Sequence, residues 1–309
     1  MTYPTLAEIR KEIAPDNIWA LDDKLEEILK RQISSLPPPG NSAEAECTYP
    51  TDEPSLRGFL DRIFTRHFFQ IQNAVLQEDS FEKLISAVQH RNITMADIGC
   101  GPAVASMAFL NIVSNICCKL NRNICVNIVL NDICIEALAV GRKMLETYAK
   151  HLYGISGLNI LALNTPFPNS MVQLRRISRM LDPYDICFLP YVLDHVKEDH
   201  SYENICQQLE LLTEFCKPTG FILNLQDKFR ESLTRRIGHL LKTSVNKLNL
   251  RQKVYDSTNS CEEYSYSYFR IAIFPDQKCY GVKRRFCLQR HAFTPNLSQI
   301  SRNGLTICS

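Results

Sequence analysis

The sequence has 309 residues and a formal net charge of +2, with 45% hydrophobic and 22% charged residues. This composition supports a sizeable core with a soluble surface, and the length suits one large α/β domain plus a smaller appendage. No apolar run reaches the roughly 18 residues of a membrane span, and the early charges in MTYPTLAEIRKEI exclude a secretory signal.

The cysteines point to a reducing compartment. There are 13 of them, an odd number with irregular spacing, and no Cys-x-x-Cys pair occurs. Neither a zinc cage nor a thioredoxin-like site is signalled, so no metal site is expected. Most of the cysteines lie in apolar stretches, where a reduced thiol behaves as a small hydrophobic group. We therefore expect a cytoplasmic protein.

The charges are unevenly distributed along the chain. Residues 1–90 hold 15 acidic and 9 basic side chains, and the remainder holds 18 acidic and 26 basic ones. This asymmetry is consistent with an anionic ligand on the later part, or simply with a solvated surface.

The first part of the chain reads as helical. Apolar residues recur at three- and four-residue spacings over 5–35, and three prolines and a glycine within residues 34–46 then break the pattern. Residues 52–76 predict a further helix, with Asp52 or Ser55 as its cap. Residues 1–90 are therefore predicted to form an N-terminal helical region, which could cap the site or bind a substrate or partner.

Strands and helices alternate after Arg91. Apolar strands are predicted at 93–99, 125–132, 158–164, 184–192 and 220–226, with helical patterns at 103–120 and 134–152 between the first three. Residues 264–275 and 279–293 read as an antiparallel pair. The pattern predicts an α/β fold with a doubly wound, mostly parallel seven-stranded sheet over 91–309.

The glycine-rich stretch TMADIGCGPAVASMAFL, residues 94–110, lies between the first strand and the first helix of this sheet. Glycines there let a ligand approach main-chain N–H groups at a helix N-terminus. A dinucleotide site requires Gly-x-Gly-x-x-Gly, but Val104 stands at the third glycine. Such a site also requires an acidic residue about 20 positions on, whereas Asp132 follows Gly99 by 33 positions.

The segment from Asp97 to Ala103 resembles the first motif of class I S-adenosylmethionine-dependent methyltransferases, an acidic residue followed by Gly-x-Gly-x-Gly. Alanine replaces the third glycine, a sterically mild departure. The resemblance covers residues 91–290, not the N-terminal region, and it implies a Rossmann-like methyltransferase fold with S-adenosylmethionine as cofactor. It implies these cofactor-binding residues: Asp97, Gly99, Cys100 and Gly101 around the methionine part, Asp132 and the adjoining Ile133 at the ribose, and Asn164 at the adenine.

Three of these residues could have a purely structural role instead of binding the cofactor. Asp132 could instead cap the following helix, Asp97 could order the loop through nearby N–H groups, and Asn164 could form a turn. Cys100 is interpreted as a small residue whose backbone faces the ligand rather than as a nucleophile, because no neighbour would make it a thiolate.

The methyl acceptor should lie at the end of the fourth strand, DPYDICFLPYVLDHV. Phe188 stands where amino methyltransferases acting on bases or glutamine have a polar residue, which argues against that subclass. His195 and Asp194 are the candidate catalytic bases, and Tyr191 could line the cleft; His195 could equally be an ordinary residue at a helix start.

The preferred function is methyl transfer to a small-molecule acceptor, ahead of a protein side chain or an RNA position. The basic segment 228–253 is a potential phosphate contact or an ordinary solvated helix. Two alternatives remain: a catalytically silent interaction or regulatory protein, and a nicotinamide-dependent oxidoreductase. The sequence predicts neither membrane association nor an oligomeric state.

Overall fold

The structure, a computed structural model, describes residues 3–15, 20–38, 49–167, 183–192, 208, 212, 215–227, 268–275 and 286–293. Five helices come first in the chain: α1 (Leu6–Ile13), α2 (Asp23–Ser35), α3 (Glu53–Arg62), α4 (Phe64–Val75) and α5 (Glu78–Val88). They are followed by β1 (Asn92–Ile98), α6 (Val104–Leu120), β2 (Ile124–Asp132), α7 (Ile135–Ala149) and β3 (Ile155–Asn164). The remaining elements are β4 (Tyr184–Pro190), β5 (Cys216–Asp227), β6 (Tyr268–Pro275) and β7 (Phe286–Phe293).

The strands form one seven-stranded sheet with the order β3-β2-β1-β4-β5-β6-β7. Strands β1 to β5 pair in parallel, β6 pairs antiparallel with β5, and β7 pairs antiparallel with β6. The prediction of a mostly parallel seven-stranded α/β sheet ending in an antiparallel pair is confirmed. The strand order reverses between β1 and β4, and in open α/β sheets ligands bind at such a switch point, outside the carboxyl ends of the strands.

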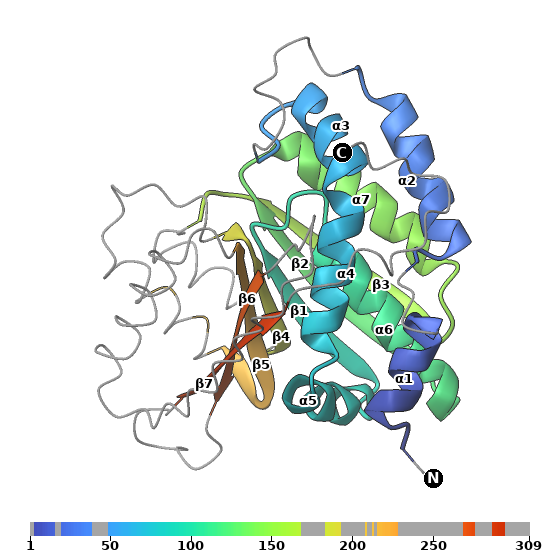
Figure 1. The fold of residues 1–309 in the computed structure, drawn as a ribbon, viewed down its shortest axis with the longest axis vertical. Coiled ribbons are helices and arrows are strands. Elements are labelled where there is room, and N and C mark those ends of the chain that lie inside the picture. The colour runs from blue at the N-terminus through green and yellow to red at the C-terminus, as the bar shows by residue number, and fades with distance from the viewer. Residues whose placement is uncertain are drawn as a thin grey trace, which may run out of the picture.

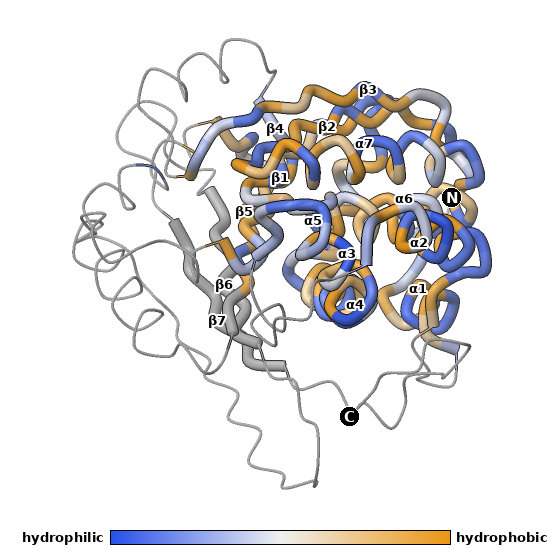
Figure 2. The backbone as a smooth tube through the Cα atoms, turned by 90° about the horizontal axis from the view of Figure 1, so that it is seen from above, coloured by the Kyte–Doolittle hydropathy of each residue, from blue (hydrophilic) through white to orange (hydrophobic). Residues whose placement is uncertain are grey.

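The helices from α1 to α7 lie on one side of the sheet (Figures 1 and 2). Helix α6 is buried along most of its length, because the sheet covers one side of it while α1 and α4 pack on the other. This burial explains why its sequence, VASMAFLNIVSNICCKL, is apolar nearly all round rather than striped.

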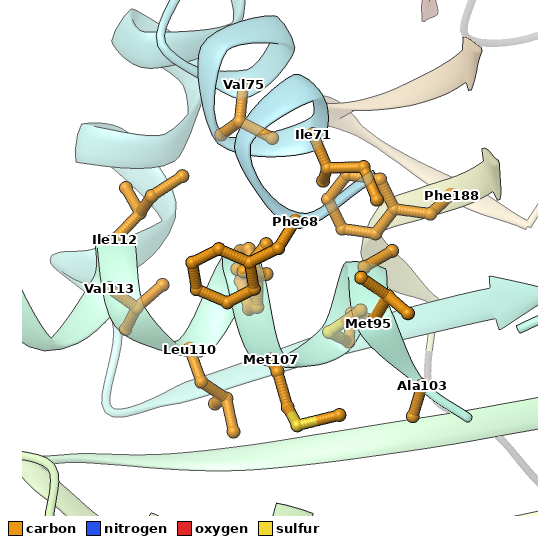
Figure 3. Packing of buried hydrophobic residues seen from close by; sticks show 14 of the residues in the cluster. Phe68, Ile71, Val75, Met95, Ala103, Met107, Leu110, Ile112, Val113 and Phe188 are labelled. Carbon is orange, nitrogen blue, oxygen red and sulfur yellow. The ribbon is translucent and has the colours of Figure 1, made fainter. Parts of the chain in front are cut away.

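Helix α4 joins the N-terminal region to the sheet. Its side chains Phe68, Ile71 and Val75 point toward α6, and Phe188 of β4 lies beside them (Figure 3). Phe188 also meets Phe109 of α6 edge-on, with ring centroids 6.0 Å apart. Each such buried side chain contributes roughly 1.5–3 kcal/mol to stability, so α4 is firmly anchored.

The N-terminal segment differs from the prediction in two details. A helix was predicted over 52–76, but α3 ends at Arg62 and α4 begins at Phe64, with Asp52 capping α3 as expected. Helix α5 was not anticipated. Apolar residues of α1 to α5 belong to the same core cluster as those of the sheet and α6, so both predicted regions share one core. The division into domains at residue 90 stays a prediction.

A partly buried polar network ties the outer helices to this core. The Tyr148 hydroxyl of α7 donates a hydrogen bond to Asp22, the residue that caps α2. Asn111 Nδ2 of α6 lies 2.8 Å from the same hydroxyl, and Gln72 Nε2 of α4 donates to Asn111 Oδ1 at 2.8 Å. Four helices are thus joined through polar side chains.

Candidate functional site

In the turn after β1, every second residue from 99 to 103 has a left-handed backbone conformation. Gly99, Gly101 and Ala103 have φ values of +64°, +51° and +60°. An L-residue in this conformation costs roughly 1–2 kcal/mol, because its Cβ crowds the following carbonyl. Alanine at position 103 is therefore strained, and the prediction that its replacement of glycine is sterically mild was wrong.

The two glycines of the motif stand in different surroundings. A Cβ added to Gly99 would lie 2.4 Å from Val192 Cγ2, whereas one added to Gly101 would meet no atom of the described residues within 4 Å. Val192 thus fills the space that a side chain at position 99 would need, whereas the described residues leave the space beside Gly101 open. Ligand approach explains a glycine at 101 better than at 99.

Helix α7 packs closely against the same turn. A Cβ on Gly141 would lie 2.7 Å from the carbonyl carbon of Pro102 and 3.0 Å from Ala103 Cβ. Gly141 therefore permits a close approach between a helix and the turn. Sequence reasoning missed this glycine, which lies 38 positions after Ala103.

Asp97, at the end of β1, is fully buried and faces α6. Its Oδ2 accepts hydrogen bonds from Ser106 Oγ at 2.6 Å and from Ser106 N at 3.1 Å, which orders the first turn of α6. Its Oδ1 is buried and has no hydrogen-bond partner among the described residues. Burial raises the pKa of the Asp97 carboxyl from 3.8 to about 7, although the Ser106 bonds act in the opposite direction.

Asp132, at the end of β2, connects two loops. Its Oδ2 accepts from Gly101 N at 2.7 Å, and its Oδ1 accepts from Cys134 N at 2.8 Å. Cys134 is the N-cap residue of α7, so Asp132 contributes to the start of that helix. Burial raises its pKa from 3.8 to about 6, while the backbone hydrogen bonds lower it. Each oxygen retains a lone pair for one further donor.

Asn164 and Ile133 lie on the outer side of this edge. Asn164 Nδ2 donates to the Ile133 carbonyl at 2.7 Å and to the Asp132 carbonyl at 3.2 Å, so it bridges the ends of β2 and β3. Ile133 is 63% exposed, so its side chain is accessible from solvent.

Asn131 is a site residue that sequence reasoning missed. Its carbonyl accepts a 3.0 Å hydrogen bond from Cys100 N, and its Nδ2 donates to Thr165 Oγ1 at 2.7 Å. Asn131 therefore joins the loops that follow β1 and β3. The signal was its place beside Asp132 at the end of an apolar strand, where an asparagine side chain needs partners.

Cys100 is not placed as a nucleophile. Its thiol is buried, and burial together with the Asp97 charge raises its pKa well above its ordinary value. A protonated thiol is a poor nucleophile. The buried side chain fits the interpretation of Cys100 as a small residue within the turn.

The backbone N–H groups of the turn are largely used inside the protein. Cys100 N donates to the Asn131 carbonyl, Gly101 N to Asp132 Oδ2, and Ala103 N to the Cys100 carbonyl. Ser106 N donates to Asp97. A phosphate group would need such N–H groups to be free.

The expected methyl-acceptor site, at the end of β4, lies only partly within the described residues. Tyr191 follows β4 directly and is buried, and its hydroxyl donates to Gln70 Oε1 of α4 at 2.6 Å. His195 and Asp194 lie outside the described residues, as does the basic segment 228–253. Phe188 is buried in the core against Phe109.

The described residues contain neither a metal-binding cluster nor a membrane-spanning helix. Among them, no cluster of three or more histidine, cysteine, aspartate or glutamate residues could hold a metal ion. None of the helices in the described part of the chain is long and apolar enough to span a membrane.

No protein-family model and no curated protein matches the sequence. Solved structures do match it. A putative S-adenosylmethionine-dependent methyltransferase from Methanococcus maripaludis is 14% identical, with a TM-score of 0.36, over 66% of this chain and 76% of that one. A methyltransferase of the DUF858 family from Leishmania major is 12% identical, with a TM-score of 0.34, over 73% and 70%.

A third structure, precorrin-6y C5,15-methyltransferase from Geobacter metallireducens, is 14% identical, with a TM-score of 0.32, over 68% of this chain and 83% of that one. All three are described as methyltransferases, the class whose first motif the segment from Asp97 to Ala103 resembles. The topology of this chain is itself that of a mostly parallel, Rossmann-like α/β sheet with its candidate site at the switch point.

Proposed function

We propose that the protein binds S-adenosylmethionine at the carboxyl edge of β1 and β2 and transfers its methyl group to an acceptor beyond β4. This cofactor supplies an activated methyl group on a sulfonium, together with an ammonium group, a carboxylate and two ribose hydroxyls. The observation that carries the proposal is a buried carboxylate, Asp132, bonded to Gly101 N where the described residues leave open space, with a second buried carboxylate, Asp97, near the end of the neighbouring strand.

The donor and acceptor groups fit this cofactor. Asp97 Oδ1 is a buried acceptor without a hydrogen-bond partner among the described residues, a suitable position for a cationic group to interact with. Asp132 keeps lone pairs that can accept hydrogen bonds from ribose hydroxyls. A bound cation would also favour the charged form of Asp97, whose pKa is about 7 in the free protein.

The same geometry disfavours a nicotinamide dinucleotide. Its pyrophosphate would require N–H groups of the turn, but those of Cys100, Gly101 and Ala103 already have partners inside the protein. A second anion beside Asp132 would also be repelled by its charge. The oxidoreductase hypothesis is therefore the weaker one.

We assign the acceptor to the small-molecule class. The acidic excess of residues 1–90 as a whole is unfavourable for the binding of a nucleic-acid backbone by this part of the chain. His195 and Asp194 are proposed as bases for an acceptor that must lose a proton. A catalytically silent protein of the same fold would bind the cofactor or nothing and would methylate no acceptor.

Calorimetric titration with S-adenosylhomocysteine tests the cofactor. We expect saturable binding, and Asp132→Asn should weaken it about 5- to 150-fold, the equivalent of roughly 1–3 kcal/mol for disturbed buried hydrogen bonds. NAD(H) should give no comparable heat.

Asp185→Asn is the matched control. Asp185 is a buried carboxylate whose Oδ2 accepts from Thr94 N at 2.9 Å and pairs with Lys217 at 2.8 Å. It lies near the amino end of β4, away from the turn. This variant should lose stability but bind S-adenosylhomocysteine as the wild type does. Absence of binding to folded wild-type protein at millimolar ligand would refute the proposed cofactor.

A further inference from the structure

Tyr191 has a backbone conformation that bulky residues avoid. Its φ is +60°, directly after the last residue of β4. A non-glycine residue in this region is strained and persists only where surrounding contacts enforce it. The contacts that enforce it here come from two directions.

The side chain of Tyr191 is held by helix α4. Its hydroxyl donates to Gln70 Oε1 at 2.6 Å, and its ring stacks on His67, with centroids 4.1 Å apart and planes inclined by 18°. His67 in turn meets Phe59 of α3 edge-on at 5.7 Å. The backbone of Tyr191 is fixed from the other side, since its N–H donates to the Leu225 carbonyl of β5 at 2.8 Å.

Val192, the next residue, lies against the glycine turn. Val192 Cγ2 occupies the place where a side chain at Gly99 would lie, 2.4 Å from the position of an added Cβ. Gly99 is the first residue after β1 and begins the turn that contains Gly101. Helix α4, Tyr191, Val192 and Gly99 thus form one continuous series of contacts or covalent links.

We propose that Tyr191 is a positioning residue of the methyl-transfer site. Through the hydroxyl bond to Gln70 and the stack on His67, α4 sets where Val192 presses on Gly99, and thereby sets the shape of the cofactor turn. This inference rests on the proposed function, and it makes a helix of the N-terminal region part of the cofactor site rather than a separate cover.

The decisive comparison is between Tyr191→Phe and Tyr148→Phe. Both changes remove a buried tyrosine hydroxyl that bonds to a side-chain oxygen, but Tyr148 bonds to Asp22 in the outer helices. Both variants should lose thermal stability, and Tyr148→Phe should lose more, because its hydroxyl bonds to a carboxylate and also accepts from Asn111 Nδ2. Only Tyr191→Phe should weaken S-adenosylhomocysteine binding, by about two- to tenfold, the equivalent of one hydrogen bond.

Gln70→Met removes the acceptor while keeping the length of the side chain. It should weaken binding like Tyr191→Phe, and the double variant should be no weaker than either single one, because both remove the same bond. It also tests the bond if Tyr191→Phe fails to fold. Unchanged affinity in Tyr191→Phe or Gln70→Met, or equal weakening in Tyr148→Phe, would overturn the inference.

A ligand-free measurement separates this inference from the proposed function. The methyl resonances of Val192 in a ¹³C-methyl-labelled protein should shift in Tyr191→Phe and stay in place in Tyr148→Phe. If the wild type binds no S-adenosylhomocysteine, the proposed function fails and the Val192 shift decides the inference by itself. A Val192 resonance unmoved by Tyr191→Phe contradicts it.

Discussion

Substituting alanine for Gly101 tests whether the open space beside the turn is where the ligand lies. The new Cβ would meet no atom of the described residues within 4 Å, so the expected cost in the free protein comes from the φ of +51°. That cost is about 1–2 kcal/mol of unfolding free energy, or a fall of about 2–8 °C in Tm. The methyl group would project into the space that a bound cofactor needs.

The effect on binding should be larger than the effect on stability. Forcing a methyl group into a packed contact costs roughly 1–3 kcal/mol, which corresponds to a loss of about 5- to 150-fold in affinity for S-adenosylhomocysteine. Thermal unfolding and calorimetric titration of the same preparation measure both quantities. A folded Gly101→Ala protein with wild-type affinity would refute the assignment of this space to the cofactor.

Gly99→Ala provides the contrast. Position 99 has a similar φ of +64°, but the added Cβ would lie 2.6 Å from Val192 Cβ. Overpacking adds roughly 1–3 kcal/mol to the conformational cost, so this variant should unfold at a lower temperature than Gly101→Ala. Equal Tm values for the two variants would mean that Val192 does not press on Gly99.

Two further predictions concern the surroundings of the turn. Gly141→Ala should lower Tm, although alanine favours a helix by about 1 kcal/mol, because its Cβ would lie 2.7 Å from the Pro102 backbone; a higher Tm in thermal unfolding would contradict this close approach. Asp97→Asn should remove a pH dependence: a carboxyl with its pKa raised from 3.8 to about 7 contributes stability below about pH 4 that is lost as the pH rises toward 7. Urea unfolding from pH 4 to 7.5 should therefore show the wild type losing stability relative to the variant, and a constant difference would count against the raised pKa.

The sheet was predictable because its strands are locally encoded. Apolar runs such as the one ending in Asp132 read as buried parallel strands, and the glycines mark the turn after β1. The candidate cofactor residues follow from the resemblance to class I methyltransferase motifs. The hydrogen bonds that these residues accept from backbone N–H groups could not be predicted in the same way, because the partner of Asp132 is Gly101, 31 positions earlier in the chain.

Contacts between distant segments were beyond sequence reasoning. Tyr191 and Gln70 are 121 positions apart, and no local pattern pairs them. The left-handed conformation of Ala103 was also missed, because alanine gives no signal for a positive φ. From the sequence alone, Gly141 is only a residue that weakens its helix. The structure shows that it lies against the turn at Pro102 and Ala103.

The placement of α6 between the sheet and the N-terminal helices has a consequence for synthesis. Helix α4 leaves the ribosome first, but the surface on which it packs is complete only when α6 follows, about 45 residues later. At roughly 5–20 residues per second, this delay lasts about 2–9 s. During that time α6 is absent from the side of α4 that carries Phe68, Ile71 and Val75, so the nascent chain presents an apolar helix face to chaperones before its core is complete.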